Sequence, residues 1–300
     1  MTSSRKNVSA KTELLEHSAA LAKKKRAGKI VFLSVLFLLV VLGAGYLLVS
    51  SIFLIKNISV GGNTLVESAE ISNYLIGALT GKYFYLFPKS SVFLYARKDL
   101  ENGLLAKFPR LKNSVIELVD RNTIQVEVSE RGTDAVWCGK EMATASSTGE
   151  TDRCYFADES GFVFAESPLF SGSSFIELRG SLPAEPIGNR PLPENTYRLV
   201  SRFARYLTEI FAKTAHDNYR LTATVIREGE YRAMIADSDR PEVGNWVVIF
   251  DNEESADEIA GNLFSIFESP AFRKEMLLHK NGLESIDLRN GKKVFYRFKD

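Results

Sequence analysis

Histidine and cysteine are scarce in this sequence, and the short motifs that mark common catalytic centres are missing. The 300 residues include three histidines and two cysteines. There is no G-x-S-x-G, no H-E-x-x-H, no phosphate-binding P-loop and no glycine run of a dinucleotide-binding fold. A catalytic centre needs several converging groups. We therefore expect a protein that is not an enzyme and that has no catalytic, cofactor-binding or metal-binding residues.

The three histidines and the carboxylates give little support to an enzyme. His17 precedes a long apolar run, and His216 and His279 are expected at helix ends. A histidine at a helix end is more often a dipole partner or a surface residue than a catalytic base. Carboxylates are numerous but evenly scattered. A glycosidase that acts on the cell wall needs two of them facing one cleft, and the sequence leaves this alternative open.

Charge is absent from residues 30–55, a run of 26 residues from Ile30 to Ile55. A transmembrane helix needs about 20 predominantly apolar residues. A buried core helix and a cleaved signal peptide are the alternatives. The apolar part of a signal peptide spans about 7–15 residues, whereas here the apolar run continues past Gly43-Ala44-Gly45. We predict a retained transmembrane helix over residues 30–55.

The charges that flank this run predict the orientation of the helix. Residues 1–29 contain eight lysines and arginines against two glutamates, which gives a net charge of +6. The whole chain carries +1, so the remainder carries −5. Because positive flanks stay in the cytoplasm, we predict a cytoplasmic tail, 1–29, on a single-pass protein of the inner or plasma membrane. The rest of the chain would be periplasmic or extracellular. Nucleic-acid binding by Lys23–Arg26 is the weaker interpretation, since anionic headgroups explain the same charge.

Both cysteines, Cys138 and Cys154, follow the predicted membrane helix. An oxidising compartment permits a disulfide there. The flanking segments, 135–137 and 155–157, are predicted strands of a hairpin, which would place the two sulfurs opposite each other. A crosslink that closes about 15 residues contributes roughly 3 kcal/mol in the chain-entropy model. We predict a disulfide rather than a metal site or a catalytic thiol, because two thiols without a nearby histidine make a poor zinc site.

Hydrophobic periodicity after residue 56 predicts an α+β protein with two folded domains. Residues 56–131 read as a strand, two helices and two strands, with a turn at Gly61-Gly62-Asn63. Residues 132–300 predict a larger, mixed or antiparallel β-sheet domain with helices. The stretch 180–193 contains four prolines and is expected to be a crossing loop or a hinge. Three arginines of the next helix are expected on a solvated face: Arg198, Arg202 and Arg205.

Several short motifs occur in an order that resembles one family. They are Gly62-Asn63, Glu70-Ile71, Phe108-Pro109, Val115, Glu130-Arg131, the D-x-x-G-x-x-F set Asp158, Gly161 and Phe164, and the closing Ile286-Asp287-Leu288-Arg289. With the basic tail and the single membrane helix, the set resembles the FtsQ/DivIB family of bacterial cell-division proteins over nearly the whole chain. The chain departs from the family pattern at Asp120–Asn122 and Gly132-Thr133, where family members often carry proline, and in its Cys138–Cys154 loop.

The resemblance implies a fold and a function. It implies a POTRA module of β-α-α-β-β order at 56–131 and an FtsQ/DivIB-type β domain at 132–300. The implied function is a scaffold of the division septum, recruited through the POTRA module, that binds FtsB- and FtsL-like partners and sits in the cell membrane. No nucleic acid and no small-molecule substrate is implied. The alternatives are a POTRA-type envelope transport or chaperone component and an anchored cell-wall hydrolase.

The last predicted strand is the candidate partner-binding site under this resemblance: Val294, Phe295, Tyr296, Arg297 and Phe298. It follows Asn290-Gly291, which is a strong hairpin signal between alternating runs. An edge strand would offer unpaired backbone groups to a partner strand. Lysines and arginines would then be the charges that natural edges carry: Lys292, Lys293, Arg297 and Lys299. The alternative, a strand inside the sheet, stays open, and the resemblance favours the edge.

Overall fold

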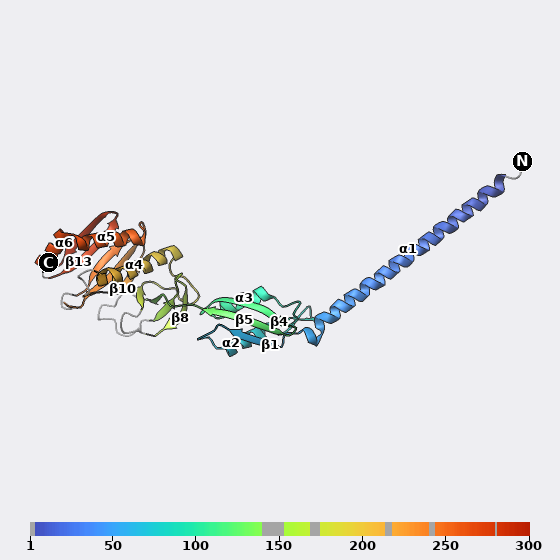
Figure 1. Ribbon diagram of the computed structural model, residues 1–300, viewed down its shortest axis with the longest axis horizontal. Helices are drawn as coiled ribbons and strands as arrows, with labels where there is room; N and C mark the ends of the chain where they lie inside the picture. The colour runs from blue at the N-terminus through green and yellow to red at the C-terminus, as the bar shows by residue number, and fades with distance from the viewer. Residues whose placement is uncertain (1–3, 140–152, 169–174, 214–217, 240–243, 280) are drawn as a thin grey trace. The chain divides into compact units, whose positions relative to one another are not determined.

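The computed structural model describes residues 4–139, 153–168, 175–213, 218–239, 244–279 and 281–300 (Figure 1). The chain divides into two compact units. The first comprises Met1–Asn102 and Val115–Glu127, and the second comprises Gly103–Ser114 and Val128–Asp300. Helices and strands are mixed in the chain, which confirms the predicted α+β class. His216 lies outside the described residues.

The chain begins with one long helix, α1 (Ser4–Val49), which includes most of the basic tail. Its part Lys24–Val49 is long and apolar enough to cross a membrane. The helix ends six residues before the predicted boundary at Ile55, because the chain turns through the short 3-10 helix η1 (Ser51–Phe53). Ile55 is buried, and its N–H donates to the Ser90 carbonyl at 2.8 Å. The uncharged run of residues 30–55 therefore contains two kinds of structure. It includes the last part of helix α1 and, at Ile55, a core residue of the first unit.

A three-stranded sheet follows α1, in the order β1-β5-β4, with β1 parallel to β5. The elements are β1 (Asn57–Gly61), α2 (Ser68–Leu79), β2 (Lys82–Tyr83), β3 (Phe87–Pro88), α3 (Arg97–Lys107), β4 (Leu111–Asp120) and β5 (Thr123–Glu130). Helix α2 buries Ile71, Leu75 and Leu79, as the periodicity predicts. The small β2–β3 hairpin between the two helices was not predicted.

The second unit contains a nine-stranded mixed sheet in the order β14-β13-β12-β11-β10-β9-β6-β7-β8. Its elements are β6 (Ala135–Cys138), β7 (Cys154–Ala157), β8 (Val163–Ser167), β9 (Ile176–Arg179), α4 (Glu194–Lys213), β10 (Tyr219–Arg227), β11 (Glu230–Asp237), β12 (Trp246–Phe250), α5 (Ala256–Glu268), α6 (Pro270–Leu278), β13 (Leu283–Asn290) and β14 (Lys293–Phe298). Three neighbouring pairs are parallel, namely β6 with β9, β9 with β10, and β12 with β13. The predicted large mixed sheet is present.

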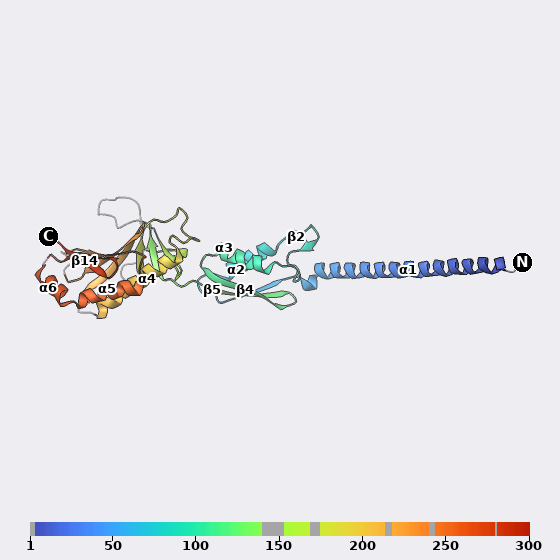
Figure 2. The same ribbon diagram turned by 90° about the horizontal axis from the view of Figure 1, so that it is seen from above.

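Helices α4 and α5 cover one face of the nine-stranded sheet (Figure 2). The Phe203 ring of α4 lies 4.5 Å from the Phe250 ring of β12, measured between centroids. Helix α5 starts with a capping box, in which Ser255 and Glu258 satisfy each other's backbone N–H groups. One continuous apolar core results, and its deepest large side chains include Trp137 and Tyr197.

The predicted disulfide is present and joins Cys138 of β6 to Cys154 of β7. The two residues are direct partners in the antiparallel ladder, with their Cα atoms 4.1 Å apart. Most of the polar loop that the disulfide closes, residues 140–152, lies outside the described residues. The bridge packs with Val136 and Phe156 in a small cluster of its own.

Candidate functional site

Strand β14 forms one edge of the nine-stranded sheet, and β8 forms the other. On its inner side β14 pairs antiparallel with β13, with Tyr296 opposite Ile286. In the part of the chain that the structure describes, no strand pairs with the outer side of β14. Of the two placements left open by the sequence, the last strand therefore takes the edge.

The outward backbone groups of β14 follow from a hydrogen bond at its end. The N–H of Lys299 donates to the Gly282 carbonyl at 3.0 Å, on the side of β13. Successive backbone groups of a strand point to alternate sides in the plane of the sheet. The N–H groups of Phe298, Tyr296 and Val294 therefore point away from β13. An extended peptide that lies along β14 would find these donors in its plane.

The side chains of β14 divide between the two faces of the sheet. Val294, Tyr296 and Phe298 are half-buried and pack against the main core. The Tyr296 ring lies 4.9 Å from the ring of Phe272 in α6, and the Phe298 ring stacks on His279 at 4.2 Å. On the opposite face, Phe295 is 56% exposed. Aromatic packing therefore fixes the core-facing side chains of β14, while the opposite face of the sheet has one exposed ring, that of Phe295.

Two of the four predicted edge charges have polar partners in the sheet or next to it. Arg297 places Nε 2.6 Å from Glu284 Oε2 on β13, and the Arg297 side chain stays 71% exposed. The Lys299 ammonium donates to the Asn245 carbonyl at 3.3 Å. An exposed ion pair of this kind stabilises a fold by about 1 kcal/mol or less. The pair holds a charged side chain along the edge, and charged side chains there oppose random strand pairing.

The motif Ile286-Asp287-Leu288-Arg289 lies in β13, and its residues alternate between the two faces of the sheet. Ile286 and Leu288 are buried, whereas Asp287 and Arg289 lie on the other face. Arg289 bonds Asp287 at 3.0 and 2.6 Å and reaches Glu230 at the start of β11 at 2.5 Å. The side-chain bond from Arg289 lowers the pKa of Asp287 against the opposing effect of burial. The motif thus fixes β13, the strand on which β14 lies.

The opposite edge, β8, is partly covered by the chain itself. The N–H of Val163 donates to the Asn189 carbonyl at 2.9 Å, and the N–H of Gly188 donates to the Val163 carbonyl at 2.8 Å. These bonds come from the proline-rich stretch 180–193, which is an ordered crossing loop. A partner strand would have to displace this loop to pair along the whole of β8.

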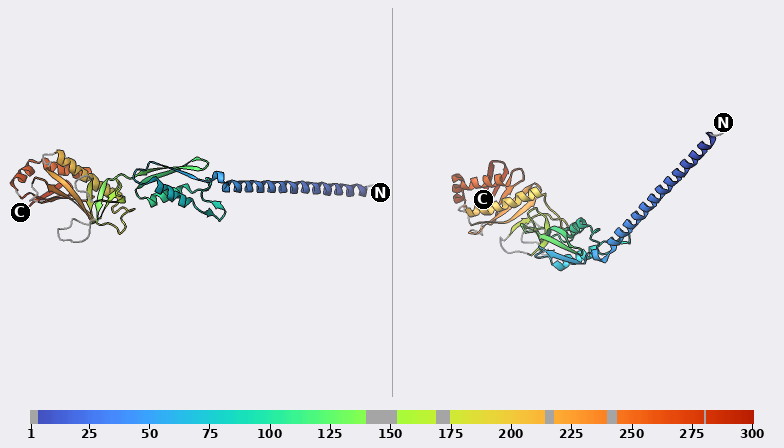
Figure 3. Two further views of the ribbon diagram at one scale, coloured as in Figure 1. Left: turned by 90° about the horizontal axis from the view of Figure 1, so that it is seen from below. Right: turned by 45° about the vertical axis from the view of Figure 1, so that its right-hand side comes forward.

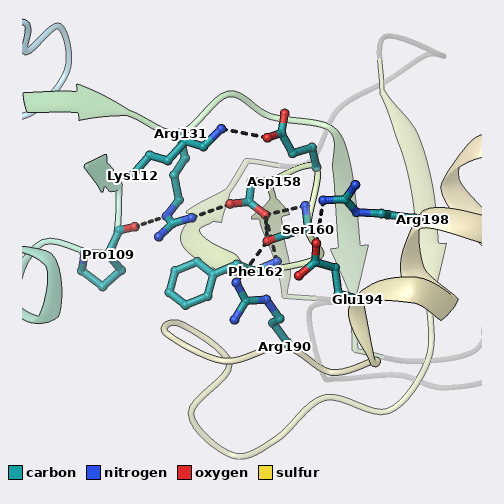
Figure 4. Close-up of polar contacts among 10 residues, drawn as sticks. Pro109, Lys112, Arg131, Asp158, Ser160, Phe162, Arg190, Glu194 and Arg198 are labelled. Atoms are coloured by element: carbon teal, nitrogen blue, oxygen red, sulfur yellow. Dashed lines mark hydrogen bonds and ion pairs between the residues drawn. The ribbon is translucent and has the colours of Figure 1, made fainter.

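The turn before β8 is built around the carboxylate of Asp158 (Figure 4). Its Oδ1 accepts from the Ser160 hydroxyl at 2.7 Å and from the N–H groups of Ser160 and Phe162 at 2.9 and 3.1 Å. Its Oδ2 accepts from Arg131 at 2.5 Å. Arg131 also donates to the Pro109 carbonyl at 3.0 Å, and its guanidinium lies 4.1 Å from the Phe162 ring centroid. The cluster holds segments around residues 109, 131 and 160 together within the second unit.

The charge of Asp158 is stabilised in spite of burial. The side chain is only 5% exposed, and burial alone would raise its pKa. Hydrogen bonds from Ser160, Arg131 and the Phe162 backbone outweigh this effect, so the pKa of Asp158 lies below its ordinary value. A buried carboxylate with this many donors acts as a structural anchor for the turn.

Gly161 and Tyr197 lie against each other behind this turn. Gly161 has a φ of +75°, and a Cβ atom there would come within 2.7 Å of Tyr197 Cγ. The Tyr197 hydroxyl donates to Asp134 at 2.9 Å, as does the Ser201 hydroxyl. Burial and the Asp134 charge raise the pKa of Tyr197 far above its ordinary value, so the hydroxyl remains a donor. Position 161 therefore requires glycine for two reasons: its positive φ angle and the closeness of the Tyr197 side chain.

The arginines of α4 do not form an unpaired basic patch. Arg198 bonds Glu194 at 2.5 Å, Arg202 bonds Asp257 at 3.1 Å, and Arg205 pairs with Asp134. Their side chains are 50–60% exposed. They are solvated and paired on the surface, which agrees with the predicted solvated face.

Comparisons with known proteins give no family for this chain. No protein family matches it, and no curated protein is significantly similar. Among the described residues there is also no group of three or more His, Cys, Asp or Glu side chains that could hold a metal ion. The sheet edges and the apolar helix are therefore the features of the chain that bear on its function.

Sequence reasoning placed some of these residues and missed others. It named the five residues of β14, which the structure places together on one strand. Asp158 and Arg131 belong to two separate motifs of the sequence, and neither motif pairs them. The sequence Asp158-Glu159-Ser160-Gly161, a polar stretch between apolar strands, does indicate a turn that begins at Asp158. The partner, 27 residues earlier, could not be identified from that signal.

Proposed function

We propose that this chain is a membrane-anchored scaffold of the bacterial division septum that binds a partner by strand addition at β14. The single observation that carries the proposal is the edge position of β14, with outward N–H groups at alternate residues. The resemblance of the motifs to the FtsQ/DivIB family supports the cellular role. The proposed role needs positioned binding surfaces and no catalytic residue.

Strand addition explains how such a protein would recognise small partners. A partner in extended conformation would satisfy the outward groups of β14 and become a tenth strand. Phe295 would contact side chains of the added strand on the exposed face of the sheet. The lysines and arginines along the edge would favour a partner segment with acidic residues. The proposed partners are FtsB- and FtsL-like single-pass proteins.

The proposed topology places the sheet outside the cytoplasm. In it, α1 crosses the cell membrane, the basic tail is cytoplasmic, and the rest of the chain is periplasmic or extracellular. The disulfide suits such a compartment. The order of β1, α2, α3, β4 and β5 supports a POTRA module at residues 56–131, with a β domain at 132–300. Under the proposal, the POTRA module recruits the chain to the septum.

The direct test is site-specific photocrosslinking of the full chain in dividing bacterial cells. A benzophenone amino acid at Phe295 should crosslink to a small single-pass division protein. The matched control is Phe264 of α5, which is 43% exposed on a helix rather than beside the edge. Crosslinking at Phe264 but not at Phe295 would contradict edge binding.

Localisation tests the cellular role separately. A fluorescent fusion of the full chain should gather at midcell before constriction. An even distribution around the envelope would contradict the septal role and favour an envelope transport or chaperone component.

A further inference from the structure

The β2–β3 hairpin carries three large apolar side chains that are mostly exposed to solvent. Phe84, Tyr85 and Leu86 form its turn and are 87%, 95% and 66% exposed. We call these three residues the aromatic tip. Scattered exposed apolar residues are normal in proteins, but a contiguous exposed cluster commonly marks an interaction site.

The backbone of the aromatic tip is also unfavourable for its residues. The Leu86 N–H donates to the Tyr83 carbonyl at 3.1 Å, and Phe84 and Tyr85 have φ angles of +49° and +61°. A hairpin turn with two positive φ angles strongly prefers Asn-Gly. Bulky residues are strained in this conformation. The tip therefore combines apolar exposure with backbone strain, which is a pattern found at functional sites.

The aromatic tip lies in the same unit as α1, close to where that helix ends. The hairpin continues into residues 90–93, which bond the chain that leaves α1. Val92 N–H donates to the Phe53 carbonyl at 2.9 Å, and Leu54 forms an isolated bridge with Ser91. The Phe53 and Phe93 rings lie 5.3 Å apart. Figures 2 and 3 show the hairpin beside the end of α1.

In the sequence around the aromatic tip, the charges are of one sign. Lys82 and Lys89 flank it, and no aspartate or glutamate occurs between Glu70 and Asp99. The Lys89 ammonium lies 5.8 Å from the Tyr83 ring centroid. Aromatic rings at the headgroup level with lysines beside them are typical of segments at a membrane–water interface.

We propose that the aromatic tip inserts into the interfacial layer of the membrane that α1 crosses. Phe84, Tyr85 and Leu86 would enter the headgroup region, and Lys82 and Lys89 would contact anionic lipid headgroups. The inference rests on the membrane anchoring of the proposed function. It adds a second lipid contact, which fixes how the first unit stands on the bilayer.

The test uses the full chain in vesicles of phosphatidylcholine and phosphatidylglycerol. An environment-sensitive fluorophore is attached through Tyr85→Cys, since Cys138 and Cys154 are joined in a disulfide and do not react. Nitroxide-labelled lipid should quench this probe at least twofold more than a probe at Leu65→Cys. Leu65 is 71% exposed and follows β1, which leads away from the end of α1. Equal quenching at both positions would overturn the proposal.

A second variant separates insertion from turn structure. Phe84→Asn with Tyr85→Gly gives the turn its preferred residues and removes both rings. The variant should melt at the same or a higher temperature than the parent, and a probe at Leu86→Cys should lose at least half of its quenching. Undiminished quenching in the Asn-Gly variant would overturn the proposal.

Flotation of the same vesicles distinguishes the two hypotheses. In the first outcome, the chain stays with the vesicles after alkaline extraction but the probe at position 85 is not quenched. This outcome supports the α1 anchor and overturns insertion of the aromatic tip. A chain that is extracted by alkali overturns the anchoring itself, and the tip proposal with it.

Discussion

The two edges of the nine-stranded sheet are protected in different ways. At β8, Val163 exchanges backbone hydrogen bonds with the loop at Gly188 and Asn189. At β14, the described chain provides no such cover, and positive side chains line the edge instead. Edge strands invite pairing with other chains unless they are covered or charged. A loop cover opposes any partner that does not displace it, whereas charges discourage most partners and attract an acidic one.

The turns that precede the two edge strands also differ in the interactions that hold them. The turn before β8 is locked by the buried carboxylate of Asp158 and by the contact of Gly161 with Tyr197. The turn before β14 is Asn290-Gly291, in which Gly291 adopts a φ of +62°. One edge is thus held by interactions distant in sequence, and the other by a local hairpin. We expect mutations at the first to reduce stability and mutations at the second to reduce binding.

The largest loss of stability is expected for Asp158→Ala. The change leaves the mostly buried Arg131 guanidinium without its carboxylate and removes the acceptor of the turn. Removing one partner of a buried ion pair costs about 3 kcal/mol. Chemical unfolding of the full chain in detergent micelles measures this loss. Glu159→Ala is the matched control, because Glu159 bonds Lys112 at an exposed site, and we expect a much smaller loss. Equal losses would contradict the special role of Asp158.

A smaller loss is expected for Gly161→Ala. The added Cβ would meet the Tyr197 ring, and the positive φ adds strain. Gly188→Ala is the control, since Gly188 has a φ of +90° with nothing within 4 Å of a Cβ. We expect about 1 kcal/mol for the control, from strain alone, and about 1 kcal/mol more for Gly161→Ala. The same unfolding measurement compares them, and similar values would show that Tyr197 moves aside freely.

Acid should weaken the covered edge through Asp158. Because the folded state lowers the pKa of this carboxyl, its contribution to stability is complete above the unfolded pKa of about 3.9. The contribution is lost as the pH falls from there through the lower folded pKa. Between pH 7 and pH 3, the melting temperature of the parent should fall further than that of Asp158→Asn. Equal falls in the two proteins would show that other carboxylates account for acid sensitivity.

Sequence periodicity predicted the elements but not all of their ends. The buried face of α2 and the hairpin of Cys138 and Cys154 were foreseen, because both depend on local spacing. The end of α1 at Val49 was not, since residues 50–55 are as uncharged as a membrane segment although Ile55 belongs to a folded core. The β2–β3 hairpin was missed because Phe84-Tyr85 stands where turn chemistry calls for Asn-Gly.

At the sheet edges, too, local features could be predicted from the sequence and long-range contacts could not. The Asn-Gly turn predicted the last hairpin, and the family resemblance favoured an edge position for its second strand. The cover of β8 by residues 188–189 could not be foreseen, because nothing in either segment identifies the other. Pairing across the sheet depends on contacts between distant residues, which a single sequence does not encode in a readable pattern.

The smallest effect on stability and a clear effect on binding are expected for Tyr296→Pro. Proline removes an N–H that points away from β13, and proline is tolerated on edge strands. The free energy of unfolding should change by about 1 kcal/mol or less, mainly through lost packing on Phe272. Photocrosslinking from position 295 should fall about tenfold, because the partner strand loses a central backbone bond.

Two variants decide how this result is interpreted. Tyr296→Val keeps the N–H and removes the ring, so it should match the stability of Tyr296→Pro while retaining the crosslink. Arg297→Pro removes an N–H that points toward β13, so it should destabilise the sheet by more than Tyr296→Pro does. If Tyr296→Pro unfolds the protein and Arg297→Pro does not, the outward direction assigned to Tyr296 is wrong. If Tyr296→Pro leaves both stability and crosslinking unchanged, partners do not add a strand at β14.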